Sequence, residues 1–152
     1  NFIIQEEKKM DQIIVAFWSG TGNTESMAEM VGKGVEEAGK TAKVVSVEDI
    51  TPEELASQPV FALGCPSMGD EELEETIMEP FVAELEKNVS GKTIGLFGSY
   101  GWGDGEWMRN WVERMQKAGA AVVDSEGVIC NEAPDDEAEE ACKGLGKKLA
   151  AI

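Results

Sequence analysis

Residues 13–24, which read I-I-V-A-F-W-S-G-T-G-N-T, decide the fold. The apolar run at 13–18 is typical of a strand buried on both faces of a parallel sheet. Glycines and hydroxyl residues fill 19–24, and glycines let a turn curl until several backbone N–H groups converge at the start of a helix. The stretch therefore predicts a strand, a phosphate-binding turn that contains no lysine or arginine, and a helix. The alternative is a tight turn that only caps the helix.

The rest of the chain continues the alternation of strands and helices. Further strands are predicted at 42–47, 60–64, 93–98 and, with an interruption, at 121–123 and 128–130. Helices are predicted at 24–38, 72–86, 106–118 and 135–151, with a short helical turn at 52–55. This pattern predicts a doubly wound α/β fold with right-handed crossovers: a five-stranded parallel sheet in the order 2-1-3-4-5, with helices on both faces.

Composition limits the possible functions. The length of 152 residues suits one domain, which we place at 10–152, with 1–9 as an N-terminal extension or expression remnant. Thirteen basic against thirty acidic residues give a net charge of -17, which argues against binding to nucleic acid or to a membrane surface. The same charge suits docking to basic partner proteins. No apolar run has the length of a membrane span and no secretory signal is recognisable, so we expect a soluble, monomeric, cytoplasmic protein.

Cysteine and histidine content narrows the chemistry. Cys65, Cys130 and Cys142 are odd in number and lack the C-x-x-C spacing of zinc sites, so we expect reduced thiols and no metal. The chain has no histidine, which removes Ser-His and Cys-His nucleophile systems. No residue is therefore predicted to be catalytic.

Two further loops follow predicted strands and meet the first at the carboxyl ends of the sheet. The loop at 66–71 reads P-S-M-G-D-E, and its methionine offers a polarizable side chain to a flat ring. The loop at 98–105, G-S-Y-G-W-G-D-G, isolates Tyr100 and Trp102 between glycines. Large aromatic side chains in such a loop favour stacking on a flat ligand, with Trp102 as a lid on the core as the alternative. Trp107 and Trp111, at helical spacing on the following helix, are expected to be ordinary core or boundary residues.

The sequence from Met10 to Ile152 resembles the flavodoxins of the short-chain, clostridial type. Three motifs carry the resemblance: S-G-T-G-N-T-E at 19–25, M-G-D-E at 68–71 and F-G-S-Y-G-W-G-D-G at 97–105. The run N-E-A-P-D at 131–135 is also similar to the family pattern.

The resemblance implies a site for FMN. Residues 19–24 would hold the phosphate, Ser67 and Ser99 would lie near the ribityl chain, and Met68 and Trp102 would sandwich the ring. Glu71 would accept a hydrogen bond from flavin N3–H, and the backbone of 99–104 would line the pyrimidine end. The complete predicted set is Ser19, Gly20, Thr21, Gly22, Asn23, Thr24, Pro66, Ser67, Met68, Gly69, Asp70, Glu71, Ser99, Tyr100, Gly101, Trp102, Gly103 and Asp104.

The function implied is a low-potential one-electron carrier that binds FMN non-covalently, cycles between semiquinone and hydroquinone, and shuttles electrons between redox proteins. A flip of the Gly69–Asp70 peptide would give the semiquinone a hydrogen bond that oxidised FMN lacks. Nearby carboxylates and the absence of a cation would disfavour the anionic hydroquinone.

Three alternatives remain open. A flavin-dependent NAD(P)H or quinone reductase on the same fold would need a substrate pocket above the ring. A receiver domain would need an aspartate after the third strand, where this chain has G-C-P at 64–66. A flavodoxin-like domain of a longer protein would perform the same chemistry with tethered partners.

Overall fold

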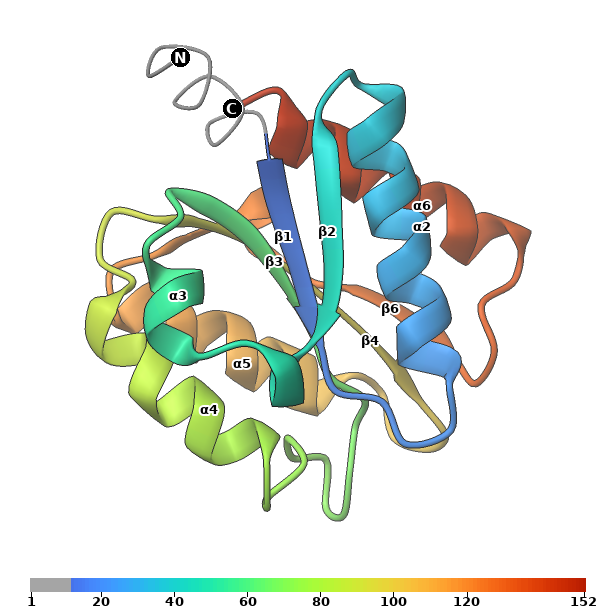
Figure 1. Ribbon diagram of the computed structural model, residues 1–152. Coiled ribbons are helices and arrows are strands. Elements are labelled where there is room, and N and C mark those ends of the chain that lie inside the picture. The colour runs from blue at the N-terminus through green and yellow to red at the C-terminus, as the bar shows by residue number, and fades with distance from the viewer. Residues whose placement is uncertain (1–11) are drawn as a thin grey trace, which may run out of the picture.

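The computed structural model describes residues 12–152, and the predicted extension at 1–9 lies outside them. One parallel sheet forms the centre of the molecule (Figure 1). Its strands are β1 (Gln12–Phe17), β2 (Thr41–Ser46), β3 (Val60–Gly64), β4 (Thr93–Tyr100), β5 (Ala121–Val122) and β6 (Val128–Asn131). The order is β2-β1-β3-β4-β5, and β6 also pairs with β4, so the predicted order 2-1-3-4-5 is confirmed. The expected interruption separates the last strand into β5 and β6.

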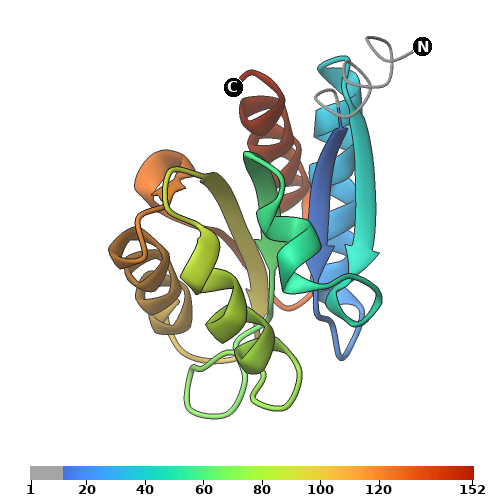
Figure 2. The same cartoon turned by 60° about the vertical axis from the view of Figure 1, so that its left-hand side comes forward.

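Helices cover both faces of the sheet, as predicted. They are α2 (Asn23–Glu37), α3 (Pro52–Ala56), α4 (Met78–Leu85), α5 (Glu106–Lys117) and α6 (Asp136–Ala150), with short 3-10 turns η1 (Val47–Asp49), η2 (Glu86–Asn88) and η3 (Val123–Ser125). Figures 1 and 2 show α2 and α6 together on one face, and α3, α4 and α5 on the other. In the described part of the chain, no helix combines the length and apolarity needed to cross a bilayer.

Strand alternation divides the core into two layers. Ile14 and Ala16 of β1 pack with the side chains of α3, α4 and α5, whereas Ile13, Val15 and Phe17 pack with those of α2 and α6. Successive strand residues point to opposite faces, so a continuous apolar run supplies both layers. Trp107 and Trp111 are buried in the first layer, which confirms their predicted place in the core.

The helix predicted at 72–86 is wrong in its first turns, because α4 begins only at Met78. Glu74 stops the helix from starting earlier. Its side chain is only 7 % exposed, and its carboxylate accepts hydrogen bonds from the backbone N–H groups of Thr76 (2.8 Å), Ile77 (2.8 Å) and Met78 (2.9 Å), and from the Thr76 hydroxyl. One buried carboxylate therefore supplies acceptors for the amides that a helix leaves unpaired at its start.

Arg114 fixes α5 to α4. Its guanidinium donates two hydrogen bonds of 2.7 Å to the carboxylate of Glu79 and one of 2.9 Å from Nε to Glu86. Such a bidentate pair sets the orientation of both partners as well as their separation. The helix that follows the 98–105 loop is thus held to its neighbour.

The α2–α6 contact depends on glycine in each helix. A Cβ atom at Gly34 would lie 2.1 Å from the Lys143 carbonyl oxygen, and one at Gly146 would lie 2.0 Å from the Val31 carbonyl oxygen. We expect Gly34→Ala and Gly146→Ala each to lower the free energy of unfolding by about 3 kcal/mol, since rigid backbone atoms block the methyl group. Gly144→Ala is the control, because a Cβ there meets nothing within 4 Å. Denaturant unfolding measures all three, and equal effects would contradict the packing argument.

The hydrogen bonds that Glu74 accepts are expected to stabilise the protein to an extent that depends on pH. Burial alone raises the pKa of this carboxyl, but the hydrogen bonds from Thr76, Ile77 and Met78 outweigh it and hold the pKa below its ordinary value of 4.5. A lowered folded-state pKa means that the stabilisation is complete above that ordinary value and disappears as the pH falls through the folded-state pKa. We expect Glu74→Gln to lower the free energy of unfolding by about 2 kcal/mol at neutral pH, and by progressively less in acid.

The control is Glu75→Gln, which changes the same charge on an exposed neighbour. Denaturant unfolding across the acid range separates the two variants. A Glu74→Gln effect that stays constant with pH would show that the carboxylate charge does not stabilise the start of α4.

Candidate functional site

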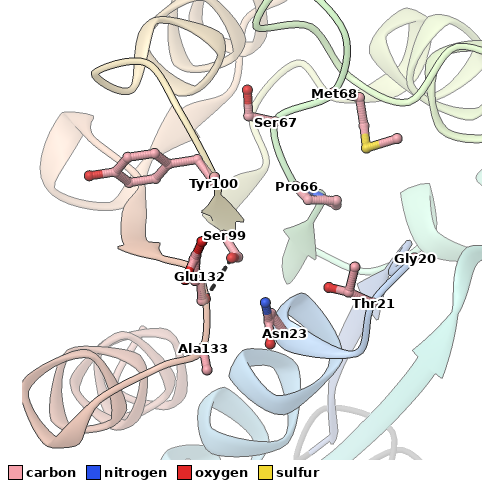
Figure 3. Close-up of a pocket in the computed structure, with 11 residues that line it drawn as sticks. Gly20, Thr21, Asn23, Pro66, Ser67, Met68, Ser99, Tyr100, Glu132 and Ala133 are labelled. Carbon is pink, nitrogen blue, oxygen red and sulfur yellow. Dashed lines mark hydrogen bonds between the residues drawn. The ribbon is translucent and has the colours of Figure 1, made fainter.

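A pocket of about 490 Å³ opens where the loops after β1, β3 and β4 meet (Figure 3). Figure 3 shows side chains from all three loops arranged around it, together with the segment after β6. The lining residues are Gly20, Thr21, Asn23, Pro66, Ser67, Met68, Ser99, Tyr100, Gly101, Glu132 and Ala133. The structure thus brings three separately predicted loops to one place.

Ser99 connects the elements that surround the pocket. It is 4 % exposed, its N–H donates to Thr24 Oγ1 (3.3 Å), and its carbonyl accepts from the Ser67 N–H (3.0 Å). Its hydroxyl donates to the Glu132 carbonyl at 2.7 Å. One residue at the end of β4 therefore holds the start of α2, the 66–71 loop and the segment after β6 in fixed relation.

The first loop is held in its curl by Ser19. Its Oγ accepts hydrogen bonds from the N–H groups of Gly22 (3.1 Å) and Glu25 (3.3 Å). Gly22, at φ 98°, precedes α2 and has no side chain with which to cap it. The structure places Ser19, Gly22 and Thr24 behind the lining, as supports for Gly20, Thr21 and Asn23.

The second loop forms a closed turn. Met68 and Glu72 exchange backbone hydrogen bonds of 2.8 Å in both directions, and between them Gly69 and Glu71 have φ values of 52° and 58°. Met68 is 39 % exposed and lines the pocket, whereas Gly69, Asp70 and Glu71 lie outside the lining. A large apolar side chain is thus left half-exposed at the rim.

The third loop places Trp102 in solvent. Its side chain is 61 % exposed, so Trp102 is not a lid on the core. Tyr100 and Gly101 line the pocket, while Trp102, Gly103 and Asp104 do not. The predicted pairing of Met68 and Trp102 around a ring therefore stays a prediction.

Glu132 and Ala133 line the pocket but were not predicted from the sequence. They follow β6, whose carboxyl end lies at the same edge of the sheet as those of β1, β3 and β4. Glu132 has φ 57°, and its N–H donates to the Tyr100 carbonyl at 2.8 Å. The N-E-A-P-D run at 131–135 was the available signal, but it lacks the glycines that marked the other loops.

The electrostatics of the pocket rest on dipoles. Among residues 12–152, the lining contains no lysine or arginine, and Glu132 is its one carboxylate. Burial raises the pKa of Cys65, at the end of β3, to about 12, and burial also raises the pKa of Cys130 beside Glu132. Both thiols are therefore protonated at neutral pH and unsuited to nucleophilic attack. No group of three His, Cys, Asp or Glu side chains in the described range could hold a metal ion.

Known proteins match this chain closely. The family model for flavodoxin matches residues 15–144. The flavodoxin of Clostridium beijerinckii is 49 % identical over 138 residues, which are 91 % of this chain and 99 % of the relative. The flavodoxin of Megasphaera elsdenii is 47 % identical over 136 residues, which are 90 % of this chain and 96 % of the relative.

The fold agrees with that of a solved relative. The solution structure of two-electron reduced Megasphaera elsdenii flavodoxin superimposes with a TM-score of 0.84 at 46 % identity, over 92 % of this chain and 99 % of the other. Family model, sequence and structure therefore lead to one assignment. This chain belongs to the flavodoxin family, the FMN-binding electron carriers.

Proposed function

We propose that the pocket between the three loops holds FMN and that the chain acts as a low-potential one-electron carrier. The observation that carries this is a pocket whose lining, within residues 12–152, combines the backbone turn at 20–23 with the half-exposed Met68 thioether and contains no lysine or arginine. FMN accepts and releases electrons one at a time when bound. Its terminal phosphate and flat ring match the two halves of the site, so the residues present fit the group.

The cradle at 19–24 is the proposed phosphate site. Amides in the first turn of a helix have no partner within the helix, and they bind anions without a charged side chain. The hydroxyl of Thr21 and the amide of Asn23 lie at the pocket and add neutral donors. Ser67 and Ser99, which also line the pocket, are assigned to the ribityl chain.

The ring is assigned to the space beside Met68 and Trp102. A thioether and an indole both pack well on a flat aromatic surface, and burying their exposed area favours binding. The backbone of 99–104 is assigned to the pyrimidine end, and Glu71 to N3–H. Gly69 tolerates either sign of φ, so its peptide with Asp70 can flip and offer the Gly69 carbonyl to N5–H.

The negative charge of the protein is expected to lower the reduction potential of bound FMN. A carboxylate about 10 Å from an added negative charge disfavours it by about 0.4 kcal/mol even in a water-like dielectric. The net charge of -17 and a pocket lining without cations both oppose the second electron. We therefore assign the carrier to the lower-potential of the two one-electron couples of FMN.

The partners that we propose follow from the same negative charge. An acidic surface favours redox proteins with basic docking surfaces and disfavours nucleic acid. We propose a cytoplasmic monomer in which residues 10–152 form the FMN-binding domain and 1–9 are an extension. We propose no enzymatic activity, because the thiols near the pocket are neutral and its lining offers no acid–base pair.

The first test adds FMN to the purified protein and titrates it anaerobically with dithionite. We expect a retained flavin spectrum with a long-wavelength band near half-reduction, because one-electron steps are well separated in such a carrier. Adding NADPH without a reductase is expected to leave the spectrum oxidised. Direct bleaching without the band would favour the two-electron reductase, and failure to retain FMN would contradict the site.

A second test removes the ring contacts. We expect Trp102→Ala to raise the Kd for FMN about tenfold through loss of stacking, and Trp102→Phe to raise it less. Val44→Ala is the matched control, because Val44 is an exposed apolar residue on β2 outside the pocket. Fluorescence quenching of FMN measures all three, and a Trp102→Ala protein with the parent Kd would refute the assigned ring site.

A further inference from the structure

The loop at 101–105 has glycine at three of its five positions and carries Trp102 into solvent, yet two charged side chains hold its far end. From α5, Arg109 donates from Nη1 to the Asp104 carbonyl (2.9 Å) and from Nη2 to Asp104 Oδ1 (3.0 Å). From the 68–72 turn, Glu71 Oε1 accepts a hydrogen bond from the Glu106 N–H at 3.1 Å. The Glu71 contact joins the 68–72 turn to the first residue of α5, 35 residues further along the chain.

The start of α5 needs such a partner. Gly105 precedes the helix at φ 95° and has no side chain to cap it. The first N–H groups of a helix lack intrahelical acceptors, and the positive end of the helix dipole favours a carboxylate. Glu71 therefore does from another loop what an N-cap side chain does locally.

The backbone on both sides of this contact is tightly constrained. The Met68–Glu72 hydrogen bonds close the turn, with Glu71 at φ 58° projecting toward α5. A Cβ atom at Gly103, which has φ 89°, would lie 2.5 Å from Glu71 Cδ and Oε1. The carboxylate thus rests directly on the backbone next to Trp102, where only glycine leaves room.

We propose that Glu71 is a positioning residue that fixes the Trp102 loop before the cofactor binds. Oε1 holds the first amide of α5, and no donor within residues 12–152 contacts Oε2, so a second donor can bind there. The loop is then ordered when the chain folds rather than when the ligand arrives, which strengthens binding by reducing its entropic cost. This inference rests on the proposed FMN site for its function, while the Glu71–Glu106 contact is made by protein atoms alone.

The test is hydrogen exchange of the Glu106 amide in FMN-free protein, read by NMR. We expect Glu71→Ala to accelerate exchange at Glu106 about tenfold, and Glu71→Gln to do so less, because the amide oxygen still accepts a weaker hydrogen bond. Amides of β1 and β3 are expected to keep their exchange rates, which separates loss of the contact from general unfolding. Glu72→Gln is the matched control: the same charge is removed from the next, exposed residue of the turn.

A second readout is the rate of FMN association, followed by stopped-flow fluorescence. We expect Glu71→Ala to slow association and Glu72→Gln to leave it unchanged. Parent exchange rates at Glu106 in both Glu71 variants would overturn the inference, as would faster exchange with unchanged FMN association. If neither the parent protein nor any variant bound FMN, the proposed function would be wrong. The exchange result would still decide whether Glu71 holds the start of α5.

Discussion

The arrangement of the pocket depends on the backbone and hydroxyl of one buried serine at the carboxyl end of β4. Ser99 satisfies Thr24, Ser67 and Glu132 at once, and so ties the start of α2 to the segments after β3 and β6, the two strands that flank β4. A buried polar group left without its partner costs stability, so each of these bonds resists separation of the segments. The loops can be rich in glycine and still keep their relative positions, because they are tied at their bases rather than along their length.

Stability and ligand contact are assigned to different parts of the molecule. The sheet and the two core layers supply stability, with close helix contacts at Gly34 and Gly146 on one face and the Arg114 ion pairs on the other. The loops at the carboxyl ends contribute little apolar burial and carry residues that line the pocket. This separation explains why Met68 and Trp102 remain exposed in a molecule whose other large apolar side chains are mostly buried.

The strand order and the three loops could be predicted because their signals are local. An apolar run such as 13–18 fits only a doubly covered strand, and a glycine-rich turn after it marks the ligand edge. The start of α4 could not be predicted, since the glutamates at 71–75 are good helix formers and nothing local shows that Glu74 will turn inward to cap Met78. Glu132 was missed because its segment lacks glycines, and the Glu71–Glu106 contact is a tertiary one that no spacing reveals.

Burial of the thiols has a consequence for the path that electrons take. Cys65 and Cys142 are fully buried, and burial raises the pKa of each to about 12. Cys130 is also buried, and burial raises its pKa as well. Oxidants and disulfides react with exposed thiolates, so protonated sulfur inside the core is chemically silent. Electrons carried by this protein are therefore protected from side reactions with its own sulfur atoms.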